Sequence, residues 1–84
     1  MNLTWTAEAW EECLCWQSHD KRNLKKINDL IKDIKREPFS GLGKPEPLKY
    51  ELSGCWSRRI TDEHRLVYEM EENSIIIISC RYHY

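Results

Sequence analysis

Residues 56–82 read WSRRITDEHRLVYEMEENSIIIISCRY, and three runs of β-forming residues follow one another within them. A shorter run of the same kind precedes them and leads through Ser53 and Gly54. The four predicted strand regions are Leu48–Leu52, Trp56–Thr61, Arg65–Met70 and Ile75–Tyr82. The polar stretches 61–64 (TDEH) and 71–74 (EENS) have the composition of hairpin turns. This part of the chain therefore predicts an antiparallel meander.

A strand and a short helix are predicted before the meander. Residues 2–6 alternate polar and apolar side chains at period two, and Thr6 can cap a helix that follows. The apolar side of this helix is expected to hold Ala7, Trp10, Leu14 and Gln17, with Cys13 beside them.

A second helix is predicted to begin after Ser18 or Asp20 and to stop at Pro38. Its apolar residues recur at spacings of three and four, as Leu24, Ile27, Leu30, Ile31 and Ile34. The other side of this helix, residues 21–36, is rich in lysine and arginine. That side is either a solvated face or a contact for RNA or for a partner protein, and the charges leave these alternatives open.

These elements predict an α+β fold. An N-terminal strand is followed by two helices, which pack on one face of a twisted, mainly antiparallel sheet. The 84 residues leave room for one domain, which we place at residues 1–84. Residues 39–47 (FSGLGKPEP) are expected to form an ordered loop or a crossover.

Composition excludes several classes of protein. Hydrophobic residues make up 40% of the chain, with four Trp and four Tyr, so disorder is not expected. No apolar stretch approaches the ~18 residues of a membrane span, and no secretory leader is evident, so we expect a soluble cytoplasmic protein with no membrane partner. The four cysteines show no CxxC spacing and are expected to act as small hydrophobes. We assign His19, His64 and His83 to a helix start, a turn and a chain end, and expect neither metal nor cofactor.

Charge is segregated along the chain although the net charge is −1. Residues 1–20 contain Glu8, Glu11, Glu12 and Asp20 but no lysine or arginine. Residues 21–36 contain seven basic residues against Asp29 and Asp33. A protein that is nearly neutral overall can therefore still present a basic surface to RNA.

Strand parity gathers cations on one sheet face. Ser57, Arg59 and Thr61 share a face, as do Arg65, Val67 and Glu69, and as do Ile77, Ser79, Arg81 and His83. If these faces coincide away from the helices, three guanidinium groups and an imidazole form an anion site, although arginine on a strand is often only a solubilising residue. Terminal Tyr84 can stack an unpaired base, whereas Tyr82 is expected in the core.

The same residues could cleave RNA without a metal. Such cleavage needs a base for the 2′-hydroxyl proton, cations for the crowded phosphorane and an acid for the departing 5′-oxygen. Glu46, held between two prolines beside Lys44 and Lys49, can be the base, and His83 can be the acid. From the residues alone, a plain surface carboxylate is the preferred interpretation of Glu46, since the sequence does not bring Glu46 and His83 together.

The chain resembles the YoeB-type toxins of the RelE/ParE superfamily over its full length. The resemblance rests on Trp5 and Trp10, on DKR (20–22), and on GKPEPLK (43–49), WSRRIT (56–61), HRLVY (64–68) and RYHY (81–84). It implies a RelE/ParE-like, microbial-ribonuclease-like fold and an enzyme, a ribosome-dependent mRNA endonuclease that cuts in the A site and inhibits translation. It also implies a YefM-type antitoxin as partner, and a homodimer.

The resemblance also implies roles for individual residues. Glu46, Arg65 and His83 would be catalytic, with Glu46 the general base, His83 the general acid and Arg65 a phosphate ligand. Arg59 would bind phosphate, and Lys49 and Tyr84 would bind or orient the substrate. Two other functions fit the fold: an RNA-binding module without catalysis, and a ParE-like gyrase inhibitor, which lacks this acid–base set.

Overall fold

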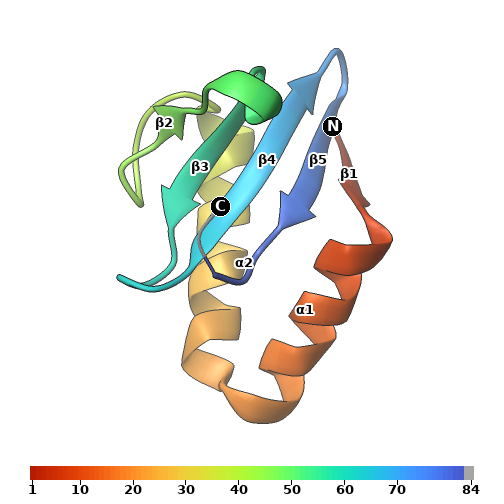
Figure 1. Ribbon diagram of the computed structural model, residues 1–84, viewed down its shortest axis with the longest axis vertical. Coiled ribbons are helices and arrows are strands. Elements are labelled where there is room, and N and C mark those ends of the chain that lie inside the picture. The colour runs from red at the N-terminus through yellow and green to blue at the C-terminus, as the bar shows by residue number, and fades with distance from the viewer. Residues whose placement is uncertain (83–84) are drawn as a thin grey trace.

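Two helices cover one face of a five-stranded sheet in the computed structural model, which describes residues 1–82 (Figure 1). In chain order the elements are β1 (Asn2–Trp5), α1 (Ala7–His19), α2 (Lys21–Arg36), β2 (Glu46–Pro47), the 3₁₀ turn η1 (Tyr50–Leu52), β3 (Cys55–Arg59), β4 (Arg65–Glu71) and β5 (Ser74–Ser79). The predicted α+β fold is confirmed.

The strands lie in the order β1-β5-β4-β3-β2. β2, β3, β4 and β5 form antiparallel pairs, so the meander is confirmed. β1 pairs in parallel with β5, with Leu3 opposite Ile75. A parallel pair needs a long connection, and here the connection contains both helices and the other three strands.

α2 packs as its periodicity predicts. Asp20, and not Ser18, caps it by accepting hydrogen bonds from the backbone N–H groups of Arg22 and Asn23. The predicted apolar side is buried against the sheet, fully at Ile27, Leu30, Ile31 and Ile34 and partly at Leu24.

α1 buries a different side from the predicted one. Thr6 caps it as expected, but the buried residues are Ala9, Cys13 and Trp16. Trp10 and Leu14 are instead partly exposed, Trp10 at 45%, and the Trp10 ring lies edge-on against Trp5. Apolar residues occur all around this helix, so periodicity alone could not select the buried side. The buried side carries the small residues Ala9 and Cys13, and α1 packs against β5.

The first predicted run of the meander was wrong in its position. Residues 48–52 form no strand, because Tyr50 has a left-handed backbone (φ 57°) and begins η1. The strand is instead β2, the pair Glu46–Pro47, which lies at the sheet edge where a proline without an N–H is tolerated. Glu46 is therefore part of a strand and not of a loop.

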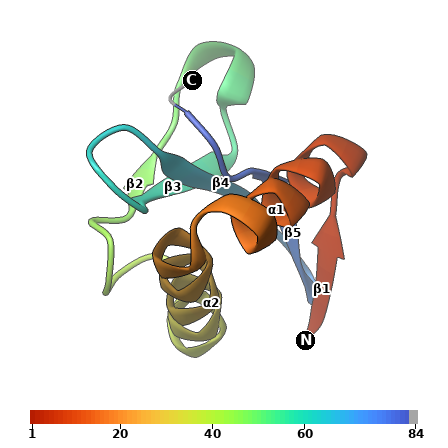
Figure 2. The same cartoon turned by 90° about the horizontal axis from the view of Figure 1, so that it is seen from below.

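A second, smaller apolar cluster lies on the sheet face opposite the helices. Leu48, Cys55 and Val67 form it, and Leu52 of η1 and Ile78 of β5 pack against it. Figure 2 shows η1 and the helices on opposite sides of the sheet. η1 covers only part of this face, so the remainder is free to carry polar groups.

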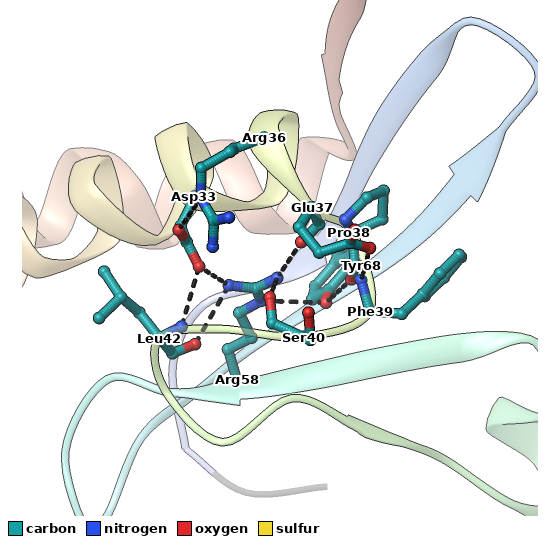
Figure 3. A network of polar contacts seen from close by, with 9 residues as sticks. All are labelled: Asp33, Arg36, Glu37, Pro38, Phe39, Ser40, Leu42, Arg58 and Tyr68. Carbon is teal, nitrogen blue, oxygen red and sulfur yellow. Dashed lines mark hydrogen bonds and ion pairs between the residues drawn. The ribbon is translucent and has the colours of Figure 1, made fainter.

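A fully buried arginine joins the loop after α2 to the sheet (Figure 3). Arg58 of β3 donates from Nε to the Tyr68 hydroxyl at 3.1 Å. One terminal nitrogen, Nη1, donates to Asp33 Oδ2 at 2.6 Å and to the Leu42 carbonyl. The other, Nη2, donates to the carbonyls of Glu37 and Ser40. All five N–H groups of the guanidinium thus have an acceptor.

The partners of Arg58 are also bound to one another. Asp33 accepts further hydrogen bonds from the Leu42 backbone N–H and from Arg36, and the Tyr68 hydroxyl donates to the Pro38 carbonyl. The loop at 37–42, which leads toward Glu46, is therefore bound to α2, β3 and β4 together.

We predict that Arg58→Met lowers the free energy of unfolding by about 3–5 kcal/mol, because it leaves the buried carbonyls and a carboxylate without their donor. Urea denaturation of the purified variant measures this loss. The matched control is Arg36→Met, since Arg36 binds the same carboxylate while its side chain is 65% exposed. That variant should lose less than about 1 kcal/mol. Equal losses in both variants would contradict the role given to Arg58.

We predict an acid-sensitive contribution from Asp33. The Leu42 N–H, and then Arg36 and Arg58, lower the pKa of Asp33 from 3.8 to about 2. A carboxyl group with a depressed pKa stabilises the fold fully above its unfolded pKa, and that contribution is lost as the pH falls from 3.8 toward 2. Thermal unfolding between pH 4 and pH 2 should therefore show a steeper fall of Tm for the natural chain than for Asp33→Asn. Parallel curves for the two proteins would exclude this linkage.

Candidate active site on the uncovered sheet face

The strand register brings one carboxylate and two guanidinium groups to the same side of the sheet. Glu46 lies opposite Ser57, and Arg59 lies opposite Arg65. Directly opposed residues point to the same face, and so do residues two apart in one strand. Glu46, Arg59 and Arg65 therefore share the face away from the helices, whereas Arg58 points toward α2. The parity prediction for Arg59 and Arg65 is confirmed.

Arg65 is held firmly at the start of β4. Its side chain is buried, and Nη1 donates to the carbonyls of Thr61, Asp62 and His64 at 2.6, 3.1 and 3.1 Å. These bonds bind the guanidinium to the β3–β4 turn. Among the described residues, the hydrogen bonds of this side chain all come from Nη1.

Two of the predicted substrate ligands, Arg59 and Lys49, are exposed. Arg59 lines a shallow groove with Lys26 of α2 and with Lys44, which has a left-handed backbone. The lysine-rich side of α2 thus reaches Arg59 through Lys26. Lys49 lines a separate shallow groove with Glu46.

Two predictions about the last strand were wrong. The last strand stops at Ser79 and not at Tyr82, and a bulge adds one residue to β5 opposite Val67 and Tyr68. Ile77 therefore faces the helices while Ser79 lies opposite Val67, so the predicted set of Ile77, Ser79 and Arg81 does not share a face.

Arg81 and Tyr82 lie beyond that strand. The guanidinium carbon of Arg81 is 5.8 Å from the centroid of a Trp16 ring and 4.8 Å from that of Tyr82. Tyr82 was expected in the core, but its side chain is 53% exposed and its backbone is left-handed. His83 and Tyr84, the predicted acid and stacking residue, lie outside the described residues.

Sequence reasoning missed His64, which it assigned to a plain turn. The residue is only 9% exposed, and its ring packs edge-on against Trp16 with centroids 4.7 Å apart. Its Nδ1 accepts a hydrogen bond from the Tyr82 N–H at 2.7 Å. The one available signal was its place directly before Arg65, at the mouth of the predicted site.

Glu12 and Trp16 of α1 were also missed. The Glu12 carboxylate accepts the Cys80 N–H, and the Trp16 indole N–H donates to the Cys80 carbonyl. Burial is the main cause that raises the pKa of Glu12 above its usual value. Nothing in the periodicity of α1 links either side chain to the end of the chain.

Residues 1–82 include all four cysteines, and each thiol is free. Cys13, Cys55 and Cys80 are buried, as expected of small hydrophobes, and burial raises the pKa of Cys80 to about 12. Over the same residues no cluster of three His, Cys, Asp or Glu side chains could hold a metal ion. Neither described helix is long and apolar enough to cross a membrane.

The fold defines a class of protein. The structure matches that of a YoeB/ParE toxin from Agrobacterium tumefaciens with a TM-score of 0.98 and 52% identity, covering 100% of both chains. The class is that of small bacterial toxins with the RelE/ParE-like fold.

The family follows from the sequence comparisons. Residues 5–84 match the family described as YoeB-like toxin of bacterial type II toxin-antitoxin system. The chain is 62% identical to Toxin YoeB of Escherichia coli strain K12 over all 84 residues of both proteins. The chain therefore belongs to the YoeB family of type II toxins, and the resemblance inferred from the sequence is confirmed.

Two solved structures from Staphylococcus aureus extend the comparison. One is a YoeB dimer, with a TM-score of 0.94 and 49% identity, and the other is a YoeB-YefM complex, with a TM-score of 0.93 and 48% identity. Each alignment covers 100% of this chain and 98% of the other. The toxin fold is thus the same in a dimer and in an antitoxin complex of that relative.

Proposed function

We propose that this chain is an endoribonuclease that cuts mRNA in the A site of the translating ribosome and so inhibits translation. Membership of the YoeB family supports its action as a toxin. The observation that carries the nuclease proposal is the shared sheet face of Glu46, Arg59 and Arg65. A general base beside two phosphate-binding cations is what cleavage by a neighbouring 2′-hydroxyl requires.

In the proposed reaction Glu46 takes the proton of the 2′-hydroxyl, whose oxygen then attacks the adjacent phosphorus. Arg65 and Arg59 stabilise the negative charge of the phosphorane, and the fixed guanidinium of Arg65 needs little reorganisation to do so. His83 donates a proton to the departing 5′-oxygen. The products are a 2′,3′-cyclic phosphate and a 5′-hydroxyl, and no metal or cofactor takes part.

The proposal also covers the remaining substrate contacts and the protein partners. Lys49, in the groove beside Glu46, and Tyr84 bind and orient the substrate. The roles of His83 and Tyr84 rest on the sequence and on the family resemblance. The S. aureus complex and dimer support a YefM-type antitoxin and a homodimer as assemblies of this cytoplasmic toxin.

We predict that Glu46→Gln lowers the rate of mRNA cleavage by about 10² or more while the fold is kept, because the base is removed from an exposed position. The assay measures mRNA cleavage in an in vitro translation reaction and, for comparison, with mRNA and toxin alone in the absence of ribosomes. The cut ends and their cyclic phosphates are mapped in both. Glu51→Gln in η1 is the matched control, since Glu51 is also exposed and should leave cleavage unchanged. A similar loss in both variants would argue against Glu46 as the base.

We predict that removal of His83 and Tyr84 abolishes growth arrest, because the acid and a substrate contact are lost together. Induction of the truncated chain in bacteria measures this effect, and binding of a YefM-type antitoxin checks that the variant is folded. Full growth arrest by the truncated chain would overturn the mechanism. Inhibition of gyrase supercoiling by that variant would instead favour the ParE-like alternative.

A further inference from the structure

The chain leaves the sheet at Ser79, but side chains of α1 hold it immediately afterwards. The Cys80 N–H donates to Glu12 Oε1 at 2.9 Å, and the Trp16 indole Nε1 donates to the Cys80 carbonyl at 2.9 Å. Both backbone polar groups of this buried residue are therefore satisfied by α1 and not by a neighbouring strand.

Tyr82 is held in the same way by the start of β4. Its N–H donates to His64 Nδ1 at 2.7 Å, and its carbonyl accepts the Arg65 N–H at 3.1 Å. Tyr82 has a φ of 63°, a left-handed conformation that non-glycine residues rarely adopt. Such a conformation persists only when neighbouring groups hold it in place, and here the two hydrogen bonds of the Tyr82 backbone do so.

The His64 ring is itself fixed on several sides. It packs against the Trp16 ring and lies with its centroid 5.4 Å from that of Tyr82. Because the Tyr82 N–H donates to Nδ1, that nitrogen carries the lone pair and the neutral ring has its proton on Nε2. Nε2 lies 3.3 Å from a carboxylate oxygen of Glu63. The ring orientation and its tautomer are thus set together.

We propose that His64 is a positioning residue for the reaction. By accepting the Tyr82 N–H, it fixes the backbone of the residue directly before the proposed acid, His83. The position of Arg65 supports this assignment. The Arg65 backbone N–H binds Tyr82, and its guanidinium binds the His64 carbonyl. His64 therefore links the guanidinium assigned to the phosphate with the segment that leads to His83. The inference rests on the proposed function, because positioning matters for the reaction only if His83 is the general acid.

Two substitutions separate the hydrogen bond from the bulk of the ring. In His64→Asn an amide oxygen can occupy the position of Nδ1, whereas in His64→Gln the acceptor lies one bond further out and cannot. We expect His64→Gln to lower kcat about tenfold or more, because the proposed acid His83 would still be present but misaligned. KM should change little, because the substrate ligands are untouched. His64→Asn should recover most of that loss. Ribosome-dependent cleavage assays of both variants measure the split.

Amide hydrogen exchange of Tyr82, followed by NMR, reports the hydrogen bond without any need for activity. Protection should fall at least tenfold in His64→Gln and be largely restored in His64→Asn. The matched control is His19→Gln, because His19 is an exposed histidine that binds only within α1. It should change neither exchange nor kcat.

The outcomes distinguish this inference from the proposed function. Equal loss of kcat in the Asn and Gln variants, or unchanged Tyr82 protection in His64→Gln, would overturn the positioning role. If the natural chain cleaved no RNA, the nuclease proposal would fail. If Tyr82 protection were nevertheless restored in His64→Asn, the hydrogen bond from Tyr82 to His64 would stand, but His64 would have no role in catalysis. Unfolding of His64→Gln, seen by circular dichroism, would mean that His64 is structural, and would overturn the inference.

Discussion

The burial of the Arg58 guanidinium is the constraint on which the arrangement of this toxin depends. A charged group without exposure is stable only if its donors are satisfied, and here five acceptors meet five N–H groups. Three of those acceptors are carbonyls of the loop after α2, so the loop cannot move without leaving part of the charge unpaired. This loop leads directly into β2, and its position therefore sets where Glu46 joins the sheet edge.

The two ends of the proposed site are positioned by different parts of the molecule. Glu46 stands on a two-residue edge strand beside β3, while the guanidinium groups of Arg59 and Arg65 belong to a hairpin whose turn is bound by Arg65 itself. The segment after β5 is bound by α1 at Cys80, and at Tyr82 by His64 and by the first residue of β4, Arg65. Glu46, Arg59 and Arg65 thus come from separate strands, and the packing of α1 fixes the backbone at Cys80 although neither helix supplies the proposed acid or base.

Part of this arrangement could be predicted because it follows from local periodicity. Alternation along β3 and β4 places Arg59 and Arg65 on one face whatever the helices do, and the spacing in α2 selects its buried side. The end of β5 could not be predicted, since Ile75–Tyr82 is β-forming throughout and the chain departs where distant side chains, Glu12 and Trp16, take over the Cys80 backbone. The parity of Arg58 predicts only that it faces the helices. Its burial depends on Asp33 and on the loop carbonyls, which no pattern in β3 reveals.

The charge distribution explains how a chain with a net charge of −1 can present a local cluster of cations. Glu8 and Glu12 of α1 line a pocket with Ile78 and Ser79 of β5, whereas Arg59, Lys44 and Lys26 line one groove near β3. β4 separates these two regions of the sheet. Because the interaction between exposed charges is screened beyond about 8–10 Å, the carboxylates of α1 subtract little from the local potential at the groove. The exception is Glu12, which is partly buried and faces Arg81, so its charge acts on the segment that leads to the chain end and not on the basic groove.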